Sequence, residues 1–178
     1  MITTVPLRYI PTSLTKKERK QQQRMLRKSR KMYKRSGSDK NKNKNKNIKS
    51  KYYTRKPLRS FKNKTSKHIL KARRLYNIDK IVPGKALAKA TGCTIPTLKR
   101  IISKGAGAYF SSGSRPNQTA QSWGVARLAS SITGGKAAAV DYNIIDKGCN
   151  HSKKAYRLAK KAREKYGYGK HRVPQVTL

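Results

Sequence analysis

Residues 83–103 read PGKALAKATGCTIPTLKRIIS and open the one long stretch, 83–149, whose composition is that of an ordinary folded domain. Two short helices are predicted at its start, with Gly92 as the turn between them and Thr94 as the N-cap of the second. The side chains expected to point inward are Leu87, Ile95, Leu98 and Ile101.

This helix pair has two interpretations. It is either a packing hairpin, since helices joined by a glycine turn commonly pack on each other, or a helix-turn-helix motif that reads DNA. In the second case Thr97, Lys99 and Arg100 would face the major groove. Thr91 stands where such motifs usually have an apolar residue, which favours the packing hairpin.

The next stretch, GAGAYFSSGSRPNQTAQSWG at 105–124, is predicted to be a long loop because small and polar residues dominate it. Nucleotide binding is not expected there, because the stretch has no Gly-Lys-Ser/Thr sequence and no strand leads into it. Trp123 would anchor the loop by packing. Polar side chains would lock its shape by hydrogen bonds, namely Arg115, Asn117, Gln118 and Gln121. Apolar spacing then predicts helices over 122–133 and 136–146.

The N-terminal part of the chain is mostly polar. Residues 1–12 are predicted to be an extended strap, because β-branched residues and prolines recur in them. Thr15 and Glu18 form a capping box, which predicts a helix to about Lys34. That helix is polar all round, so we expect no wide face to bury in a core. Residues 36–51, with alternating Lys and Asn from 40 to 47, are predicted to be a flexible linker, which either contacts a polyanion or is a plain solvated spacer.

Residues 52–62 interleave aromatic rings with cations. The candidate binding residues in this segment are Tyr52, Tyr53, Arg55 and Phe61. The pattern is typical of a surface on which rings pack while arginines reach phosphates. It is equally typical of an extended segment whose rings pin it to a domain.

Two basic helices resemble each other. Ser66 is expected to cap a helix over 67–76, and Ser152 one that ends at Tyr166. Both contain Lys-Ala-Arg-x-x-Tyr, and the second offers two candidate binding residues, Lys161 and Arg163.

The formal net charge is +40, from 46 basic and 6 acidic residues among 178. Self-repulsion on this scale calls for polyanionic partners. Residues 1–80 hold 28 basic and 3 acidic residues, whereas residues 81–150 hold 9 and 2. We therefore divide the chain into a basic arm with a linker (1–51), a basic aromatic segment (52–80), a small helical core domain (81–150) and a basic C-terminal helix with a tail (151–178). The predicted fold class is mainly α, a small helical domain with a helical hairpin and a long loop, flanked by basic helical and extended arms.

Catalytic chemistry is not expected. Asp141 and Asp146 are the only acids of the core domain, which has no histidine for a triad, and they are interpreted as salt-bridge or helix-end residues. Neither a cofactor nor a metal site is predicted, because the two cysteines and three histidines lack zinc-ligand spacing. The cysteines are predicted to be reduced. Neither a membrane span nor a signal peptide is predicted.

Several short stretches resemble a family of small basic proteins encoded by large nucleocytoplasmic DNA viruses of algae and protists. They are LTKK (14–17), LRKSRKMY (26–33), YTRK (53–56), SFK (60–62), SKH (66–68), SSGSRPNQT (111–119), SWG (122–124) and ARL (126–128). The resemblance runs from about 13 to 165, and SGSRPNQT is its most specific part. The family has no assigned function, so the resemblance implies no catalytic residues. It implies a virus with a layered particle, in which a very basic protein is often a virion component.

The sequence therefore predicts a non-enzymatic virion protein, located in the particle and present in multiple copies. As a minor capsid or cementing protein it would tie other capsid proteins together with its basic arms, whose aromatic residues would be the anchors. These anchors are Tyr9, Tyr33, Tyr52, Tyr53, Phe61, Tyr156, Tyr166 and Tyr168. The alternative is a DNA-binding protein that condenses or packages the genome, with 84–103 as its helix-turn-helix. An anionic membrane surface is a further possible partner.

Overall fold

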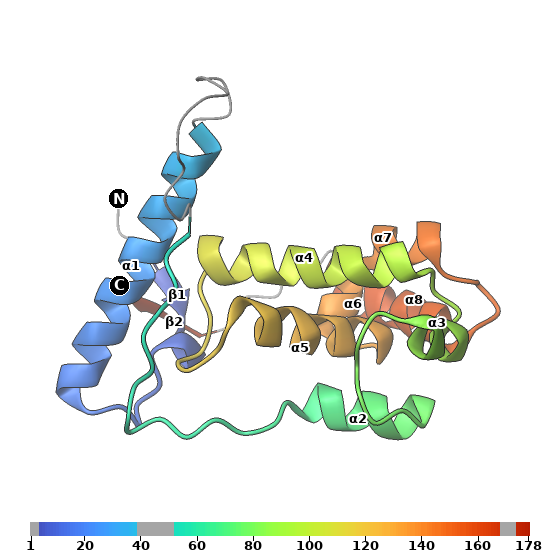
Figure 1. Ribbon diagram of the computed structural model, residues 1–178, viewed down its shortest axis with the longest axis horizontal. Coiled ribbons are helices and arrows are strands. Elements are labelled where there is room, and N and C mark those ends of the chain that lie inside the picture. The colour runs from blue at the N-terminus through green and yellow to red at the C-terminus, as the bar shows by residue number, and fades with distance from the viewer. Residues whose placement is uncertain (1–3, 39–51, 168–173) are drawn as a thin grey trace. The chain divides into compact units, whose positions relative to one another are not determined.

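The computed structural model describes residues 4–38, 52–167 and 174–178, and nearly all of its regular structure is helical (Figure 1). The predicted fold class, mainly α with a small helical domain, is confirmed. The elements are β1 (Thr4–Pro6), the 3₁₀ helix η1 (Leu7–Tyr9), α1 (Lys16–Ser38), α2 (Lys67–Tyr76), α3 (Lys85–Thr91), α4 (Ile95–Ser111), α5 (Ala120–Ile132), α6 (Lys136–Val140), α7 (Tyr142–Gly148), α8 (Lys154–Tyr166) and β2 (Gln175–Thr177).

The chain forms two compact units. The first, here called the N-terminal unit, comprises Met1–Asn63, Gly107–Ala120 and Val173–Leu178. The second, the helical unit, comprises Lys64–Ala106 and Gln121–Arg172. Each unit draws on several of the four segments distinguished in the sequence, and that division stays a prediction.

Helix α1 begins where the capping box predicts. The Thr15 hydroxyl accepts a hydrogen bond from the Glu18 amide at 3.2 Å and donates one to the Glu18 carboxylate at 3.1 Å. The first of these bonds satisfies the Glu18 amide, one of the groups that the first turn of a helix leaves without an internal partner. The helix continues to Ser38, a few residues beyond the predicted end at Lys34.

The expectation that α1 has no face to bury is wrong. Met25 and Leu26 are buried, and so are two polar residues on the same face, Gln22 and Ser29. The Gln22 amide donates to the Tyr9 carbonyl at 3.1 Å, and the Ser29 hydroxyl donates to the Phe110 carbonyl at 3.1 Å. Polar side chains can lie in a core when their hydrogen bonds are made, and a count of apolar residues misses such a face.

The extended strap is confirmed in part. Residues 4–6 form β1, which pairs antiparallel with β2 so that Val5 lies opposite Val176. The chain then turns through η1 toward α1. Val5 and Leu178 are buried, whereas Thr4, Gln175 and Thr177 are exposed, so only one side of the strand pair packs into the N-terminal unit.

The segment 52–63 runs antiparallel along α1 (Figure 1). Tyr52 stacks with Tyr33 near the far end of the helix, with ring centroids 6.1 Å apart. The Ser60 amide donates to the Glu18 carboxylate in the first turn, at 3.0 Å. A small cluster of Leu14, Met25 and Leu58, with Tyr53 and Phe61 against it, fills the interface. Of the two interpretations of this segment, packing against its own protein is the one observed.

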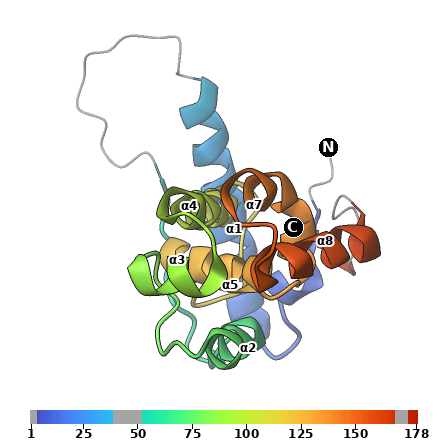
Figure 2. The ribbon, with the colours of Figure 1, turned by 90° about the vertical axis from the view of Figure 1, so that its right-hand side faces the viewer.

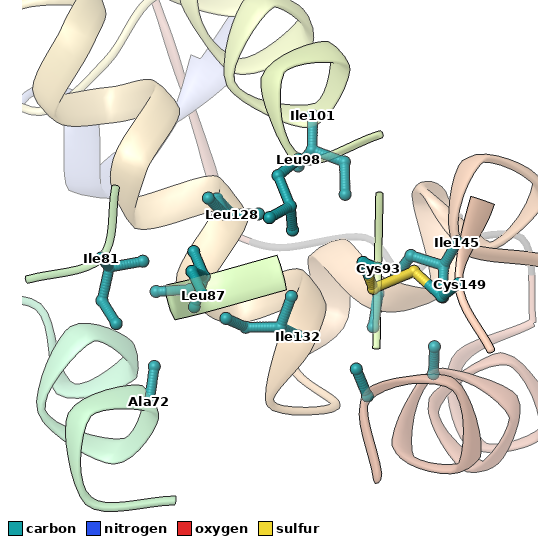
Figure 3. Packing of buried hydrophobic residues seen from close by; sticks show 14 of the residues in the cluster. Ala72, Ile81, Leu87, Cys93, Leu98, Ile101, Leu128, Ile132, Ile145 and Cys149 are labelled. Atoms are coloured by element: carbon teal, nitrogen blue, oxygen red, sulfur yellow. A yellow bond between two sulfur atoms is a disulfide. The ribbon is translucent and has the colours of Figure 1, made fainter. Parts of the chain in front are cut away.

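The helical unit has one continuous core (Figure 3). Leu87 of α3 points toward Leu128 and Ile132 of α5, while Leu98 of α4 lies nearby. Helices α6 and α7 both pack on α8 (Figure 2), and small residues of α8 make this close packing possible. The buried residues of α8 are Ala155, Ala159 and Ala162. Of the four inward positions predicted on the first two helices, all but Ile95 are fully buried.

The predicted loop over 105–124 is wrong except for residues 112–119. Residues 105–111 continue α4, and α5 starts at Ala120. Gly105 and Gly124 serve helix packing rather than a turn, because a Cβ on Gly105 would lie 2.7 Å from the Gly124 Cα. Only glycines allow α4 and α5 to approach this closely. The sequence shows the glycines but not the helix that each one meets.

Two smaller corrections concern helix ends. The single helix predicted over 136–146 is two, α6 and α7, interrupted at Asp141. The N-cap position of α8 is Lys153 rather than Ser152. Helix α2 matches its prediction, with Ser66 at the N-cap position but without a side-chain hydrogen bond.

The prediction that both cysteines are reduced is wrong, because Cys93 and Cys149 form a disulfide. The bond joins the turn before α4 to the end of α7 (Figure 3). Two backbone hydrogen bonds flank it, from the Thr94 amide to the Gly148 carbonyl at 2.9 Å and from the Asn150 amide to the Gly92 carbonyl at 2.7 Å. Two cysteines 56 residues apart carry no signal of pairing that composition alone could reveal.

Reduction of this disulfide should destabilise the protein. A bridge across 56 residues lowers the entropy of the unfolded chain and is worth about 4 kcal/mol. We expect a reductant to lower the free energy of unfolding in urea by about that amount. The variant with Cys93→Ser and Cys149→Ser should behave as the reduced protein does and should not respond to reductant. Equal stability of the oxidised and reduced wild type would contradict a stabilising role for the bridge.

Candidate functional site

The loop 112–119, which contains the most specific motif of the sequence, holds the N-terminal unit together. Gly113 adopts φ +100°, and a Cβ there would lie 2.7 Å from a Leu26 methyl carbon and 3.3 Å from the Tyr9 ring. Glycine is therefore required both by its backbone conformation and by the space available. The motif brings α1 and the N-terminal strap against one short loop.

Arg55 lies at the centre of this arrangement, with 9% of its surface exposed. Its guanidinium donates to the Ser29 hydroxyl at 3.1 Å, the Tyr109 carbonyl at 3.1 Å and the Ser114 hydroxyl at 2.8 Å. The guanidinium carbon also lies 3.7 Å from the centroid of the Tyr109 ring, a cation–π contact. Burial lowers the pKa of Arg55, and neutral acceptors hold the cation in place.

Asn117 fixes the other end of the loop. It adopts φ +56°, a left-handed conformation that asparagine tolerates. Its side chain accepts from the Leu58 amide at 2.6 Å and donates to the carbonyls of Leu58 at 2.8 Å and Phe61 at 2.7 Å. The prediction that polar residues lock the loop is confirmed for Asn117, whereas Arg115 is exposed.

The predicted aromatic and cationic binding residues of segment 52–62 are thus largely internal. Tyr53 and Phe61 pack on the small cluster described above. Tyr52 keeps 44% of its surface exposed and stacks on Phe110, with centroids 4.7 Å apart. The side chain of Arg55 holds the fold and does not face an external phosphate. Tyr168, another of the predicted anchors, lies outside the described residues.

The helix pair 84–103 resembles a packing hairpin more than a DNA reader. The expectation that Thr97 is exposed is wrong, because the residue is 8% exposed and bonded to the Thr94 hydroxyl at 2.8 Å. A Cβ on Gly148 would collide with Thr97, so α7 covers this part of α4. Lys99 and Arg100 are exposed, and their role in binding stays a prediction.

The two candidates on α8 differ. Lys161 is exposed. Arg163 is half-buried, donates to the Ala139 carbonyl at 3.1 Å, and lies 5.6 Å from the centroid of the Tyr142 ring. Lys161 remains available to a partner, whereas Arg163 joins α8 to α6.

Asp141 is the fully buried acid of the helical unit. Its carboxylate accepts two hydrogen bonds from Arg127, at 2.7 and 2.8 Å, and one from the Ser131 hydroxyl at 2.9 Å. It also forms an ion pair with Lys104, at 2.9 Å. Burial would raise the pKa of Asp141, but the bonds and charges of Arg127 and Lys104 outweigh it and hold the pKa below its usual range. The interpretation of this residue as a structural salt bridge is confirmed.

The exposed side of α1 carries a row of cations that form no salt bridge with the described residues. Six of its cations follow each other at spacings of three or four residues, so they form one stripe along the helix. The stripe, here called the cationic face, consists of Lys16, Lys20, Arg24, Arg27, Lys31 and Lys34, all exposed. It lies opposite the buried face around Ser29. At 1.5 Å per residue it is about 27 Å long.

The cationic face has no neutralising acids among the described residues. Glu18 is the one acid of α1, and it is bonded to Thr15 and Ser60. The salt bridges found in residues 4–38, 52–167 and 174–178 all involve Asp141 or Asp146. A hollow of about 260 Å³ on α1 is lined by Arg27, Arg30, Lys31 and Lys34. This surface can attract phosphate groups through charge alone.

Sequence reasoning missed the cationic face, although its signal was present. The spacing of Lys and Arg at three and four residues can be read from the sequence of the predicted helix. The prediction of a helix that is polar all round does not separate its charged side from its other side. Within the described ranges, three or more His, Cys, Asp or Glu side chains nowhere gather as a metal site would require. Among the described residues, no helix combines the length and the apolar composition that a membrane span needs.

A family model described as a family of unknown function, DUF5824, matches residues 6–151. The chain belongs to this family. No curated protein and no solved structure matches the chain. The matched range takes in α1, the 112–119 loop and most of the helical unit, and it stops before α8.

Replacing Asp141 with Asn should strongly destabilise the protein, because it leaves Arg127 and Lys104 without their counter-charge. Breaking a buried ion pair costs roughly 3–5 kcal/mol. Asp146→Asn is the matched control, since that side chain is 40% exposed and its loss should cost less than about 1 kcal/mol. Urea unfolding at pH 7 measures both.

The same pair of variants gives a pH test. Because the folded pKa of Asp141 lies below its ordinary value of 3.8, its contribution is present above that value and is lost as the pH falls through the folded pKa. Wild type should therefore lose more stability on acidification than Asp141→Asn does. Parallel pH profiles would contradict the assignment.

Proposed function

We propose that the protein is a non-enzymatic structural protein that binds nucleic acid through the sugar–phosphate backbone, with the cationic face of α1 as its contact surface. The observation that carries the proposal is the face itself: six exposed cations in one stripe, without neutralising acids among the described residues. A duplex presents one charge per about 1.7 Å. A stripe about 27 Å long therefore spans more phosphates than it has cations.

The buried side of α1 supports the same proposal. A helix with this charge would be marginal alone, yet Gln22, Leu26 and Ser29 fix it to its own unit. The cations are thereby presented on a rigid surface before any ligand binds. Preorganisation of this kind reduces the entropy lost on association. Backbone contacts of lysine and arginine carry no sequence information, so we expect non-specific binding.

The salt dependence of binding tests the proposal. Lys20→Gln, Arg27→Gln and Lys31→Gln together remove three charges of the cationic face and keep good helix formers. If each contacts a phosphate, the slope of log affinity against log salt should become shallower by about three. Fluorescence anisotropy with a mixed-sequence duplex measures it.

The control variant removes three exposed charges from α3 and α4 instead, with Lys85→Gln, Lys89→Gln and Lys99→Gln. It should leave the slope almost unchanged. If the control loses as much as the α1 variant, the cationic face is not the contact surface. If the control alone loses affinity, the helix-turn-helix alternative gains.

A virion is the setting that the sequence resemblance implies, and the minor-capsid role is the second candidate. Most of the aromatic residues expected to anchor the arms to capsid proteins pack against other parts of this chain, which favours a nucleic-acid contact. In opened particles, separated gently into shell and core, we expect this protein with the nucleic-acid core when quantified by mass spectrometry. Retention by the shell after nuclease treatment would instead support the capsid role.

A further inference from the structure

A stack of aromatic rings on the surface of the helical unit has no role in the fold described so far. His151, in the short connection between α7 and α8, lies on the ring of Tyr156 with centroids 3.8 Å apart and an interplanar angle of 12°. Tyr156 covers one side of the imidazole, yet 59% of the His151 side chain is exposed. The exposed surface is therefore the opposite face and the edge of the ring.

Polar contacts with neighbouring groups hold the two rings of the stack. The His151 Nε2 atom lies 2.9 Å from the Asp146 carbonyl oxygen and 3.6 Å from the Asp146 carboxylate, which fixes the ring plane. The Tyr156 hydroxyl lies 3.1 Å from that of Tyr142. Arg163 packs near the Tyr142 ring, at 5.6 Å from its centroid. A flat ring is thus presented to solvent in one orientation.

Cations surround this platform in the sequence. Lys147 precedes it, and Lys153 and Lys154 follow it; all three are exposed, and none forms a salt bridge in the described part of the chain. The stem of Lys153 lies over Gly92, so its backbone is anchored to the turn before α4. Exposed rings beside unneutralised cations are the combination by which proteins bind single-stranded nucleic acid without sequence preference.

We propose that His151 and Tyr156 form a platform on which an unpaired nucleobase stacks. The protein would then bind a single strand that carries bases more tightly than a strand with the same phosphates and no bases. This inference rests on the proposed function, because it takes the ligand to be nucleic acid and adds a base contact to the backbone contact already proposed. In a duplex both faces of each base are already stacked. The platform can therefore engage a strand end, a loop or a single strand.

The alternative is that the stack only joins α7 to α8. That role needs the face of His151 that touches Tyr156 and not the face in solvent. It predicts that removing the ring changes stability but leaves the choice of ligand unaltered. Ligand choice is thus the measurement that separates the two roles.

The experiment compares two single-stranded probes with equal numbers of phosphates, a mixed-sequence 20-nucleotide DNA and the same strand with abasic residues throughout. One stacked base is worth about a 5-fold to 150-fold gain in affinity. Wild type should bind the intact strand more tightly by a factor in that range. His151→Ala should reduce this ratio toward one, with the affinity for the abasic strand unchanged.

His151→Phe is the matched variant, because it keeps a flat ring over Tyr156 and loses only the contact with Asp146. It should retain most of the preference for the intact strand. Thermal melting of all three proteins shows whether each is folded at the assay temperature. The platform proposal would be wrong if His151→Ala kept the wild-type ratio of affinities for the intact and abasic strands. It would also be wrong if His151→Phe lost that ratio as fully as His151→Ala does.

The outcomes for the platform and for the cationic face are distinguishable. If wild type binds both strands equally and with a steep salt dependence, the platform is wrong while the phosphate contacts stand. If wild type does not bind the abasic strand, the proposed function fails with it.

Discussion

The guanidinium of Arg55 is the constraint on which the N-terminal unit depends. Removing a cation from water costs several kcal/mol unless its hydrogen bonds are replaced. Two remote parts of the chain replace them, α1 through Ser29 and the stretch 109–114 through Tyr109 and Ser114, and the Tyr109 ring adds a cation–π contact. The unit must therefore assemble as a whole, because each segment completes a site that the others leave unsatisfied.

The scarcity of acids explains why neutral hydroxyl and carbonyl groups, and not carboxylates, bind the guanidinium of Arg55. The chain has six acids for 46 cations, and the structure uses them sparingly. Asp141 neutralises Arg127 and Lys104 in one core, and Glu18 joins α1 to segment 52–63. Cations that are not held by carbonyls, hydroxyls or these acids remain on the surface, above all on α1. The same imbalance therefore shapes both the interior and the charged exterior.

The sequence predicted those features that are encoded locally and missed those that depend on a remote partner. The capping box of α1 and the full extent of α2 are local, and both were predicted. Gly105 was misread because its partner helix is not visible in the sequence, and the buried Gln22 because its acceptor lies in the strap. The disulfide was missed for the same reason, because each cysteine has its partner far away in the sequence. Arginine usually lies on the surface, whereas Arg55 is buried by segments that are remote in the sequence.

The pairing of β1 with β2 has a consequence for biosynthesis. Val5 and Val176 lie opposite each other in this pair although 171 residues separate them in the sequence, and α1 also needs the 112–119 loop. A nascent chain leaves the ribosome from its N-terminus, so α1 emerges long before the residues that cover its buried face. During that interval the cationic segment of α1 lacks the residues that cover its buried face, and the N-terminal unit cannot be completed before β2 has been synthesised.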